Sequence, residues 1–393
     1  MNASGFRLST RFAEVKSSPV RDIQSVIGRD DIISFAGGIP DANLFETDDF
    51  AAAFDYVLTH QAKRALQYAS TPGEPELREQ VAARLNRQLP TVAEDIQVTS
   101  GSQEGLFLVG MALLDAGDVV LVEQPTYLAA VQAFSLAGAR LVPVPSDDHG
   151  VLPDELAAAI AEHRPKFVYL VPNFQNPTGR TMPATRREAV AEILVRTGTP
   201  LLEDDPYGEL RFDGDPVAPL AALPGMAAQT VLQNSASKTM APGVRIGWLR
   251  AEGPILRALE VGKQAVGLQT AVTDQLAVAH YLANCDLDAH IAKVAAAYGQ
   301  RRDAMVEGLL PLLPATAKLN RPEGGMFLWA ELGGAVNTAE VLPRAIEAGV
   351  AFVPGWPFYA ADPDHSTMRL SFVTNTPAVI AEGLTRLARA FDW

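Results

Sequence analysis

Residues 231–250 read Val-Leu-Gln-Asn-Ser-Ala-Ser-Lys-Thr-Met-Ala-Pro-Gly-Val-Arg-Ile-Gly-Trp-Leu-Arg. An apolar start leads into a polar turn in which Lys238 lies among small hydroxyl side chains, and residues 246–249 predict another strand. Hydroxyls and an arginine bind phosphate oxygens, and a lysine amine beside them can do chemistry. Taken alone, Lys238 would be a solvated surface lysine, as most lysines are. The surrounding pattern indicates instead a site for an anionic ligand.

Composition limits the classes of function. The chain has 393 residues, of which 48% are hydrophobic and 20% charged, so it can bury a large core. A formal charge of −14 argues against nucleic-acid binding driven by phosphate neutralisation. The single cysteine, Cys285, excludes an intrachain disulfide, fits a reducing compartment and is more typical of packing than of catalysis. No apolar run of about 18 residues and no signal-peptide pattern is found, which predicts a cytoplasmic protein without a membrane span.

Strand-like and helix-like patterns alternate across residues 90–275, which predicts an α/β domain with a mainly parallel sheet. Polar residues follow several of these strands, and ligands of open α/β sheets bind at the carboxyl ends of the strands. One such end, Thr99–Gln103, reads strand, tight turn, helix. Its open N–H groups predict an anion site, although such a turn by itself more often only caps a helix.

Four further stretches accompany the lysine segment: Gly-Gly-Ile-Pro-Asp at 37–41, Pro-Asn-Phe-Gln-Asn-Pro-Thr-Gly at 172–179, Glu-Asp-Asp-Pro-Tyr at 203–207, and the arginine of Met-Arg-Leu-Ser-Phe at 368–372. With Ser-x-Ser-Lys and an arginine seven residues later, this order resembles the class I/II aminotransferases, which are fold-type I pyridoxal-phosphate enzymes. The resemblance runs from Gly37 to Phe372 and is strongest to the 2-aminoadipate, kynurenine and aromatic aminotransferases.

The resemblance implies an architecture. A large cofactor-binding domain is expected over residues 45–280, with a mainly parallel, seven-stranded type of sheet flanked by helices. Residues 1–44 and 281–393 would form a small α+β domain. It also implies a homodimer, because Tyr68 of one subunit would reach the cofactor phosphate of the other.

The resemblance implies roles for the residues at the strand ends. Lys238 would bind pyridoxal 5′-phosphate covalently and carry the substrate proton. Asp204 would keep the ring nitrogen protonated. It is chosen over Asp205 because the family places this acid three residues before the tyrosine, here Tyr207. Asp205 would be a solvated carboxylate or one that only supports its neighbours. The remaining cofactor contacts would come from Gly101, Ser102, Gln103, Tyr127, Asn176, Ser235, Ser237 and Arg245, with Tyr207 and Asn176 at the phenolic oxygen.

Arg369 lies among apolar neighbours in a predicted strand. A buried arginine needs an anionic partner, either an internal salt bridge or, as the resemblance implies, the substrate α-carboxylate. Asn176 and the loop at Gly38 would complete the substrate side. Arg21 could read a side-chain carboxylate or could simply be solvated. No metal ligand is assigned.

The function predicted from these residues is transfer of an amino group from an L-amino acid to a 2-oxo acid, with 2-oxoglutarate the favoured acceptor, by a ping-pong mechanism. A 2-aminoadipate-like, aromatic or broad specificity is expected. Two alternatives stay open at this point. One is a pyridoxal-phosphate lyase on the same scaffold, and the other is a non-catalytic protein that senses the cofactor.

Overall fold

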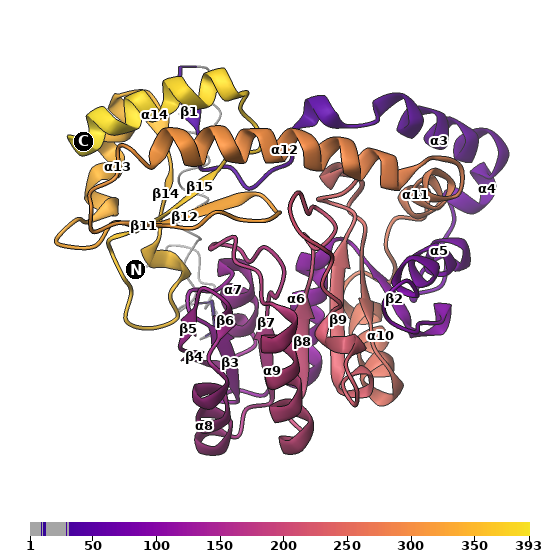
Figure 1. The fold of residues 1–393 in the computed structure, drawn as a ribbon. Helices are drawn as coiled ribbons and strands as arrows, with labels where there is room; N and C mark the ends of the chain where they lie inside the picture. The colour runs from indigo at the N-terminus through magenta and orange to yellow at the C-terminus, as the bar shows by residue number, and fades with distance from the viewer. Residues whose placement is uncertain (1–8, 10, 13–28, 30) are drawn as a thin grey trace, which may run out of the picture.

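The structure is a computed structural model that describes residue 9, residues 11–12, residue 29 and residues 31–393. A seven-stranded sheet forms its centre (Figure 1). The strands, in spatial order, are β2 (Ile96–Thr99), β10 (Gly247–Arg250), β9 (Thr230–Ser235), β8 (Leu201–Asp204), β7 (Phe167–Leu170), β3 (Val119–Glu123) and β4 (Arg140–Val144). Strand β10 pairs antiparallel with both neighbours, and the other four pairings are parallel. The expected mainly parallel sheet is confirmed.

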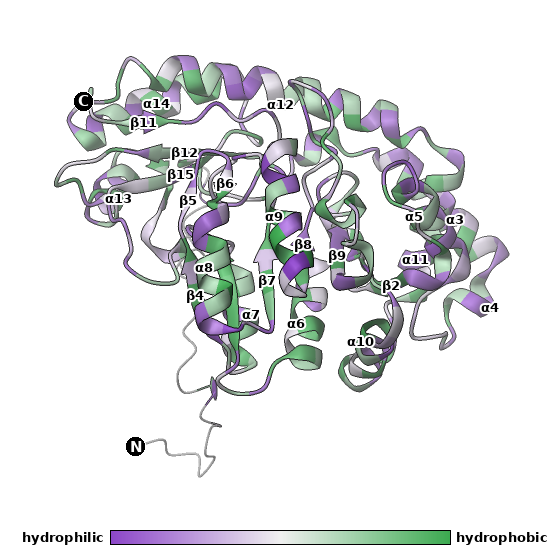
Figure 2. Cartoon of the chain, turned by 60° about the horizontal axis from the view of Figure 1, so that its bottom comes forward, coloured by the Kyte–Doolittle hydropathy of each residue, from purple (hydrophilic) through white to green (hydrophobic). Residues whose placement is uncertain are grey.

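Helices cover both faces of this sheet. One face packs against α6 (Ser102–Leu113), α7 (Leu128–Leu136) and α10 (Gly253–Val266), and the other against α8 (Pro153–His163) and α9 (Ala184–Thr197). Along β3, Val120 and Val122 join the first core while Val119 and Leu121 join the second. Burial on both faces explains why β3 and β7 are almost continuously apolar, as the labelled β7 shows in Figure 2.

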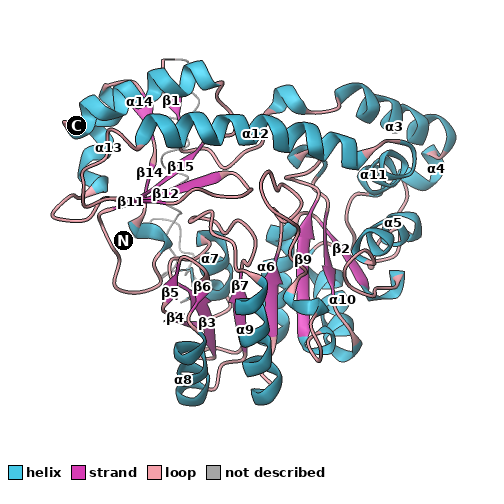
Figure 3. Cartoon of the chain, in the orientation of Figure 1, coloured by secondary structure: helices cyan, strands magenta, loops and turns pink. Residues whose placement is uncertain are grey.

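A second, four-stranded sheet lies beside the first (Figure 3). Its antiparallel order is β11 (Lys318–Leu319), β12 (Phe327–Glu331), β15 (Thr367–Ser371) and β14 (Val353–Pro354). Helices α13 (Thr338–Glu347) and α14 (Pro377–Phe391) pack around it, and a short parallel pair forms between β1 (Ile33–Ser34) and β13 (Val350–Ala351).

Helix α12 (Leu287–Leu309) connects the two parts of the molecule (Figure 1). Its first turns place Leu287 and Ile291 in the core around β2, whereas Val294 and Met305 pack in the core of the four-stranded sheet. The core around β2 is completed by α3 (Thr47–His60), α4 (Ala62–Ala65), α5 (Pro75–Leu85) and α11 (Val272–Asn284). A small hairpin, β5 (Ser146–Asp147) and β6 (Gly150–Val151), follows β4. Among the residues that the structure describes, no helix is both long and apolar enough to cross a bilayer.

Candidate active site

A cavity of about 160 Å³ opens beyond the carboxyl ends of β7, β8 and β9. Ten of its lining side chains belong to the cofactor set expected from the sequence. The cavity is lined by Ser102, Gln103, Tyr127, Val171, Asn176, Asp204, Pro206, Tyr207, Ser235, Ser237, Lys238, Pro242 and Arg245. Segments more than 140 residues apart in the chain therefore meet at one place because their strands end at the same edge of the sheet.

Lys238 lies in the loop between β9 and β10, where its Nζ donates a hydrogen bond to the carbonyl oxygen of Gly38 at 3.0 Å. Burial, together with the nearby charges of Arg369 and Arg245, lowers the pKa of Lys238 to about 8. A lysine with such a pKa has an appreciable neutral fraction near physiological pH. The neutral amine can act as a nucleophile and as a base.

The side of the cavity formed by α6 is built to hold an anion. Gly101 is the N-cap of α6 with φ = 84°, and a Cβ at this position would collide with the guanidinium of Arg245. Arg245 Nη2 donates to the carbonyl oxygen of Ser100 at 3.1 Å, so the guanidinium is held against the start of the helix. Ser235 and Ser237 add two hydroxyls 2.9 Å apart. A helix N-terminus, hydroxyls and an arginine together fit a phosphate group.

Asp204, the last residue of β8, points into the cavity with one oxygen fixed and one free. Its Oδ2 accepts a hydrogen bond from the hydroxyl of Tyr169 at 2.8 Å, and its buried Oδ1 has no partner within the described chain. Burial raises the pKa of Asp204 to about 6. A buried carboxylate oxygen without a partner needs a donor, and a protonated ring nitrogen would supply one. The site therefore fits both ends of pyridoxal phosphate.

Asp205 projects from the opposite side of the strand end. It accepts a hydrogen bond from Asn173 Nδ2 at 2.9 Å and does not line the cavity. Asp205 is half-buried and lines a different cavity, and burial raises its pKa to about 7. Its role as a solvated carboxylate or as one that supports its neighbours stays a prediction. The alternation of side chains along a strand explains why only one of the two adjacent acids reaches the cavity.

Arg369 enters the site from β15 of the other sheet. Its Nη1 donates to Asn176 Oδ1 at 2.8 Å and its Nη2 to the carbonyl oxygen of Ala36 at 2.9 Å. The guanidinium carbon lies 4.3 Å from the ring centre of Phe327 and 5.1 Å from that of Phe358. No carboxylate forms an ion pair with Arg369 in the described part of the chain, so the internal salt bridge considered from the sequence does not occur there.

Comparison with known proteins now gives the family. A family model described as "Aminotransferase class I and II" matches residues 31–387. The aromatic-amino-acid aminotransferase 1 of Thermococcus litoralis is 39% identical over 381 residues, covering 95% of this chain and 91% of the relative. The 2-aminoadipate transaminase of Thermus thermophilus is 36% identical, and the match covers 96% of this chain and 94% of the relative. This chain belongs to the class I and II aminotransferase family.

Solved structures agree. The kynurenine aminotransferase of Pyrococcus horikoshii, in complex with PMP, superposes with a TM-score of 0.93 at 38% identity and covers 98% of this chain and 96% of its own. The alpha-aminoadipate aminotransferase of Thermus thermophilus, complexed with N-(5′-phosphopyridoxyl)-L-leucine, superposes with a TM-score of 0.91 at 35% identity. The match covers 98% of this chain and 97% of the other. The resemblance, the fold class, the enzyme class and the pyridoxal-phosphate cofactor predicted from the sequence are confirmed.

Tyr68 and Gly101, both expected at the cofactor, are not among the residues that line the cavity of the aminotransferase. Tyr68 is 78% exposed and does not line the cavity of its own chain. Gly101 lies behind Arg245 and shapes the cavity through its backbone. Arg21 lies outside the described residues. Cys285 is half-buried at the end of α11 and does not line the cavity.

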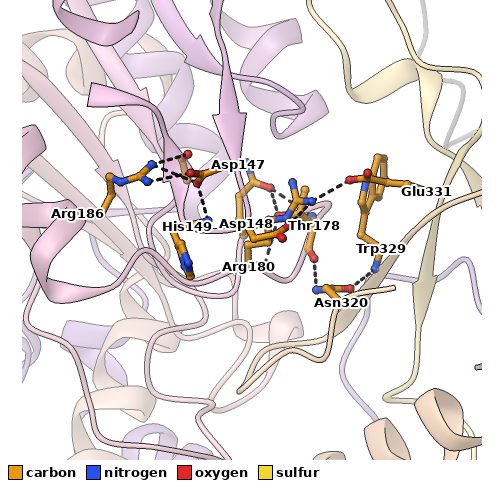
Figure 4. A network of polar contacts seen from close by, with 11 residues as sticks. Asp147, Asp148, His149, Thr178, Arg180, Arg186, Asn320, Trp329 and Glu331 are labelled. Atoms are coloured by element: carbon orange, nitrogen blue, oxygen red, sulfur yellow. Dashed lines mark hydrogen bonds and ion pairs between the residues drawn. The ribbon is translucent and has the colours of Figure 1, made fainter. Parts of the chain in front are cut away.

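The loop that follows Asn176 is fastened to the β5–β6 hairpin and to the four-stranded sheet by contacts that sequence reasoning did not identify (Figure 4). Arg180 Nη2 lies 2.8 Å from Asp148 Oδ1, between β5 and β6, and 2.8 Å from Glu331 Oε1 on β12. Asn320 donates to the carbonyl oxygen of Thr178 at 2.6 Å. Because β12 pairs with β15, these contacts hold Asn176 next to Arg369. An arginine directly after Asn-Pro-Thr-Gly was the available signal.

Proposed function

We propose that this aminotransferase takes the amino group from L-amino acids with aromatic or 2-aminoadipate-like side chains and passes it to a 2-oxo acid such as 2-oxoglutarate. The observation that carries the proposal is the meeting of Lys238, the free oxygen of Asp204, and the Asn176–Arg369 pair around one cavity. The named activities of the relatives at 36–39% identity support the choice of side chains. Amino-group transfer is favoured over the lyase alternative.

The residues present assign each part of the cofactor to a place. Arg245, Ser235, Ser237 and the start of α6 would hold the phosphate, and Asp204 would accept a hydrogen bond from the ring nitrogen. Tyr127 would lie against the flat face of the ring, as aromatic side chains do with heteroaromatic groups. When bound, pyridoxal phosphate withdraws electrons from the substrate Cα and thereby makes its proton removable.

The chain's own groups then divide the work. An ionised Asp204 would keep the ring nitrogen protonated, and Tyr207 with Asn176 would donate to the phenolic oxygen. Lys238, with its pKa lowered to about 8, would hold the cofactor and in its neutral form would take the proton from Cα of the substrate. Arg369 binds the α-carboxylate with its planar guanidinium, which fixes the orientation of Cα relative to Lys238.

Assembly and location belong to the proposal as well. The exposed Tyr68 would complete the phosphate site of a second subunit in a homodimer, which accounts for an aromatic side chain left 78% exposed beside the cofactor-binding part of the chain. We place a large domain at residues 45–280 and a small domain at 1–44 and 281–393. A cytoplasmic location fits the lone, unpaired Cys285.

A half-reaction assay tests the proposal. The loaded enzyme is mixed with one L-amino acid at a time, without an oxo acid, using phenylalanine, kynurenine, 2-aminoadipate, glutamate and leucine. The visible absorbance of the lysine-bound cofactor should disappear in one turnover with the preferred donors and return when 2-oxoglutarate is added. Ammonia release without an oxo acid would indicate the lyase instead. No spectral change with any donor would indicate a cofactor-sensing protein.

A variant addresses Arg21 in the same assay. If Arg21 binds a side-chain carboxylate, Arg21→Ala should slow the half-reaction of 2-aminoadipate and glutamate while leaving phenylalanine unchanged. An equal loss for leucine and glutamate would contradict this role.

A further inference from the structure

We propose that Tyr169 is a positioning residue that keeps Asp204 ionised and directs its free Oδ1 toward the ring nitrogen of the cofactor. The proposal rests on the proposed function, because it concerns the same site. Its starting observation is the buried hydrogen bond of 2.8 Å from the Tyr169 hydroxyl to Asp204 Oδ2. Tyr169 does not line the cavity and is not among the residues assigned from the sequence.

The fold leaves Tyr169 little freedom to move. It lies on β7, which pairs in parallel with β8, and its register partner is Leu202, two residues before Asp204. The side chain is fully buried, and its ring packs edge-on against Phe134 with 5.6 Å between centroids and 73° between planes. A tightly packed ring holds its hydroxyl at one position. The hydroxyl therefore fixes one oxygen of Asp204 and thereby the direction of the other.

Lys238 and Arg245 line the same cavity, but among the described residues no cation is a cause of the pKa shift of Asp204. Tyr169 faces Asp204 from β7, Tyr207 from the segment after β8, and the neutral Gln233 from β9. Burial raises the pKa of Asp204, and both the amide of Gln233 and the hydrogen bond from Tyr169 oppose this rise. Hydrogen bonds to ionised groups are stronger than those between neutral groups, so the bond favours the carboxylate form.

Tyr169 itself stays protonated and remains a donor. Burial, and then the charge of Asp204, raise its pKa well above the ordinary value for tyrosine, and Tyr127 and Glu123 act more weakly in the same direction. The proton consequently stays on the phenol, and the carboxylate keeps its charge for the ring nitrogen. A tyrosine thus replaces the arginine or lysine that usually stabilises a buried carboxylate.

The test is the pH dependence of cofactor affinity. Pyridoxal phosphate is titrated into the cofactor-free protein while tryptophan fluorescence is recorded, and the affinity of Tyr169→Phe is divided by that of the wild type at each pH. Loss of the bond should raise the pKa of Asp204 by about one unit, which lowers this ratio about fivefold more at pH 6 than at pH 8. A ratio of one at both pH values would overturn the proposal. So would an equal loss at both, which would mark Tyr169 as purely structural.

Three companion variants make the result specific. Tyr281→Phe removes the hydroxyl of another buried tyrosine, which stacks on Phe50 outside the cavity, and should leave the ratio at one. In an Asp204→Asn background, Tyr169→Phe should add no pH-dependent loss. Incorporation of 3-fluorotyrosine at position 169 keeps the ring, makes the phenol a stronger donor and should shift the ratio the opposite way. A shift in the same direction as Tyr169→Phe would count against the proposal.

These outcomes separate the inference from the function on which it rests. If the amino-acid half-reaction proceeds but Tyr169→Phe leaves the pH dependence unchanged, only the role of Tyr169 is lost. If no half-reaction occurs with any amino acid, the proposed function fails whatever Tyr169 does.

Discussion

The two sheets of the aminotransferase contribute to one site in different ways. The seven-stranded sheet presents Asp204, Lys238 and the anion-binding turn at or beyond strand ends, where polar groups reach the cavity without interrupting the core. The four-stranded sheet contributes Arg369 from the interior of β15, between the buried Met368 and Leu370. In the proposed function, cofactor chemistry would thus be assembled at an edge, whereas carboxylate recognition would be embedded in a strand.

This difference shows how a buried charge can be tolerated. Arg369 has two oxygen acceptors and two aromatic rings around it, although burial still lowers its pKa to about 10. Cations are attracted to the faces of aromatic rings. The polar groups at the strand ends need fewer acceptors and aromatic rings around them because they face the cavity. If the comparison holds, variants in the two sheets should affect cofactor chemistry and substrate binding separately.

The largest effect is expected on the edge side. Lys238→Ala should reduce transamination by at least about 10⁴-fold, since it removes both the nucleophile and the proton carrier. Steady-state turnover and the visible absorbance of the bound cofactor would measure this. Lys166→Ala removes a half-exposed lysine paired with Asp118 and should leave turnover unchanged. Multiple turnovers at the wild-type rate in Lys238→Ala would refute the assignment.

The strand side should show a loss in substrate binding rather than in cofactor binding. Arg369→Lys keeps a positive charge but loses the planar fork, so the KM for the amino acid should rise by about 10²- to 10³-fold. Cofactor affinity, measured by fluorescence titration, should change little. An equal loss in both would break the separation between the two sheets.

A pH effect on folding should appear in the cofactor-free protein. Burial raises the pKa of Asp204 from 3.8 to about 6, so the folded chain binds more protons than the unfolded chain between these values. Stability therefore falls as pH rises through this window, by about 2–3 kcal/mol from this group. Urea unfolding of the wild type and Asp204→Asn would measure it. As pH rises to about 6, the wild type should lose stability relative to Asp204→Asn, and above pH 6 the difference between their unfolding free energies should level off. A difference that is the same at every pH would contradict a raised pKa for the buried Asp204.

The smallest effect is expected where the sheets are fastened together. Arg180→Gln breaks the contacts with Asp148 and Glu331, which are 79% and 30% exposed, so the cost should be only about 1 kcal/mol. The KM for amino acids should rise a few-fold because Arg369 loses part of its alignment with Asn176. Arg196→Gln, which breaks an exposed pair within α9, is the matched control for stability. A KM that stays at the wild-type value would show that the two sheets are aligned without Arg180.

The motif residues could be predicted because each is part of a short sequence pattern. Asp204, for example, ends an apolar strand and precedes a proline and a tyrosine, so its place at the sheet edge follows from sequence alone. The seven-stranded sheet followed in the same way from alternating patterns. Gly38 was expected in the substrate loop, but its bond to Lys238 joins residues 200 positions apart and could not be anticipated.

Tyr169 and Arg180 were missed for a physical reason. Tyr169 is one aromatic in an apolar strand, and its role depends on the register of β7 against β8, which spacing does not reveal. Arg180 contacts acids 32 and 151 positions away along the chain, and such pairs are set by how the two sheets pack. The sequence likewise does not show that Asp205 accepts a hydrogen bond from Asn173, which depends on how the chain folds around the strand end.

The guanidinium held between Phe327 and Phe358 has a practical consequence for the bench. It is ordered in advance and has no carboxylate of its own within the described chain, so simple organic anions can take the position meant for the amino acid. Acetate, citrate or maleate in a purification buffer would then behave as competitive inhibitors and as thermal stabilisers. Apparent affinities measured in such buffers would report the salt as much as the enzyme.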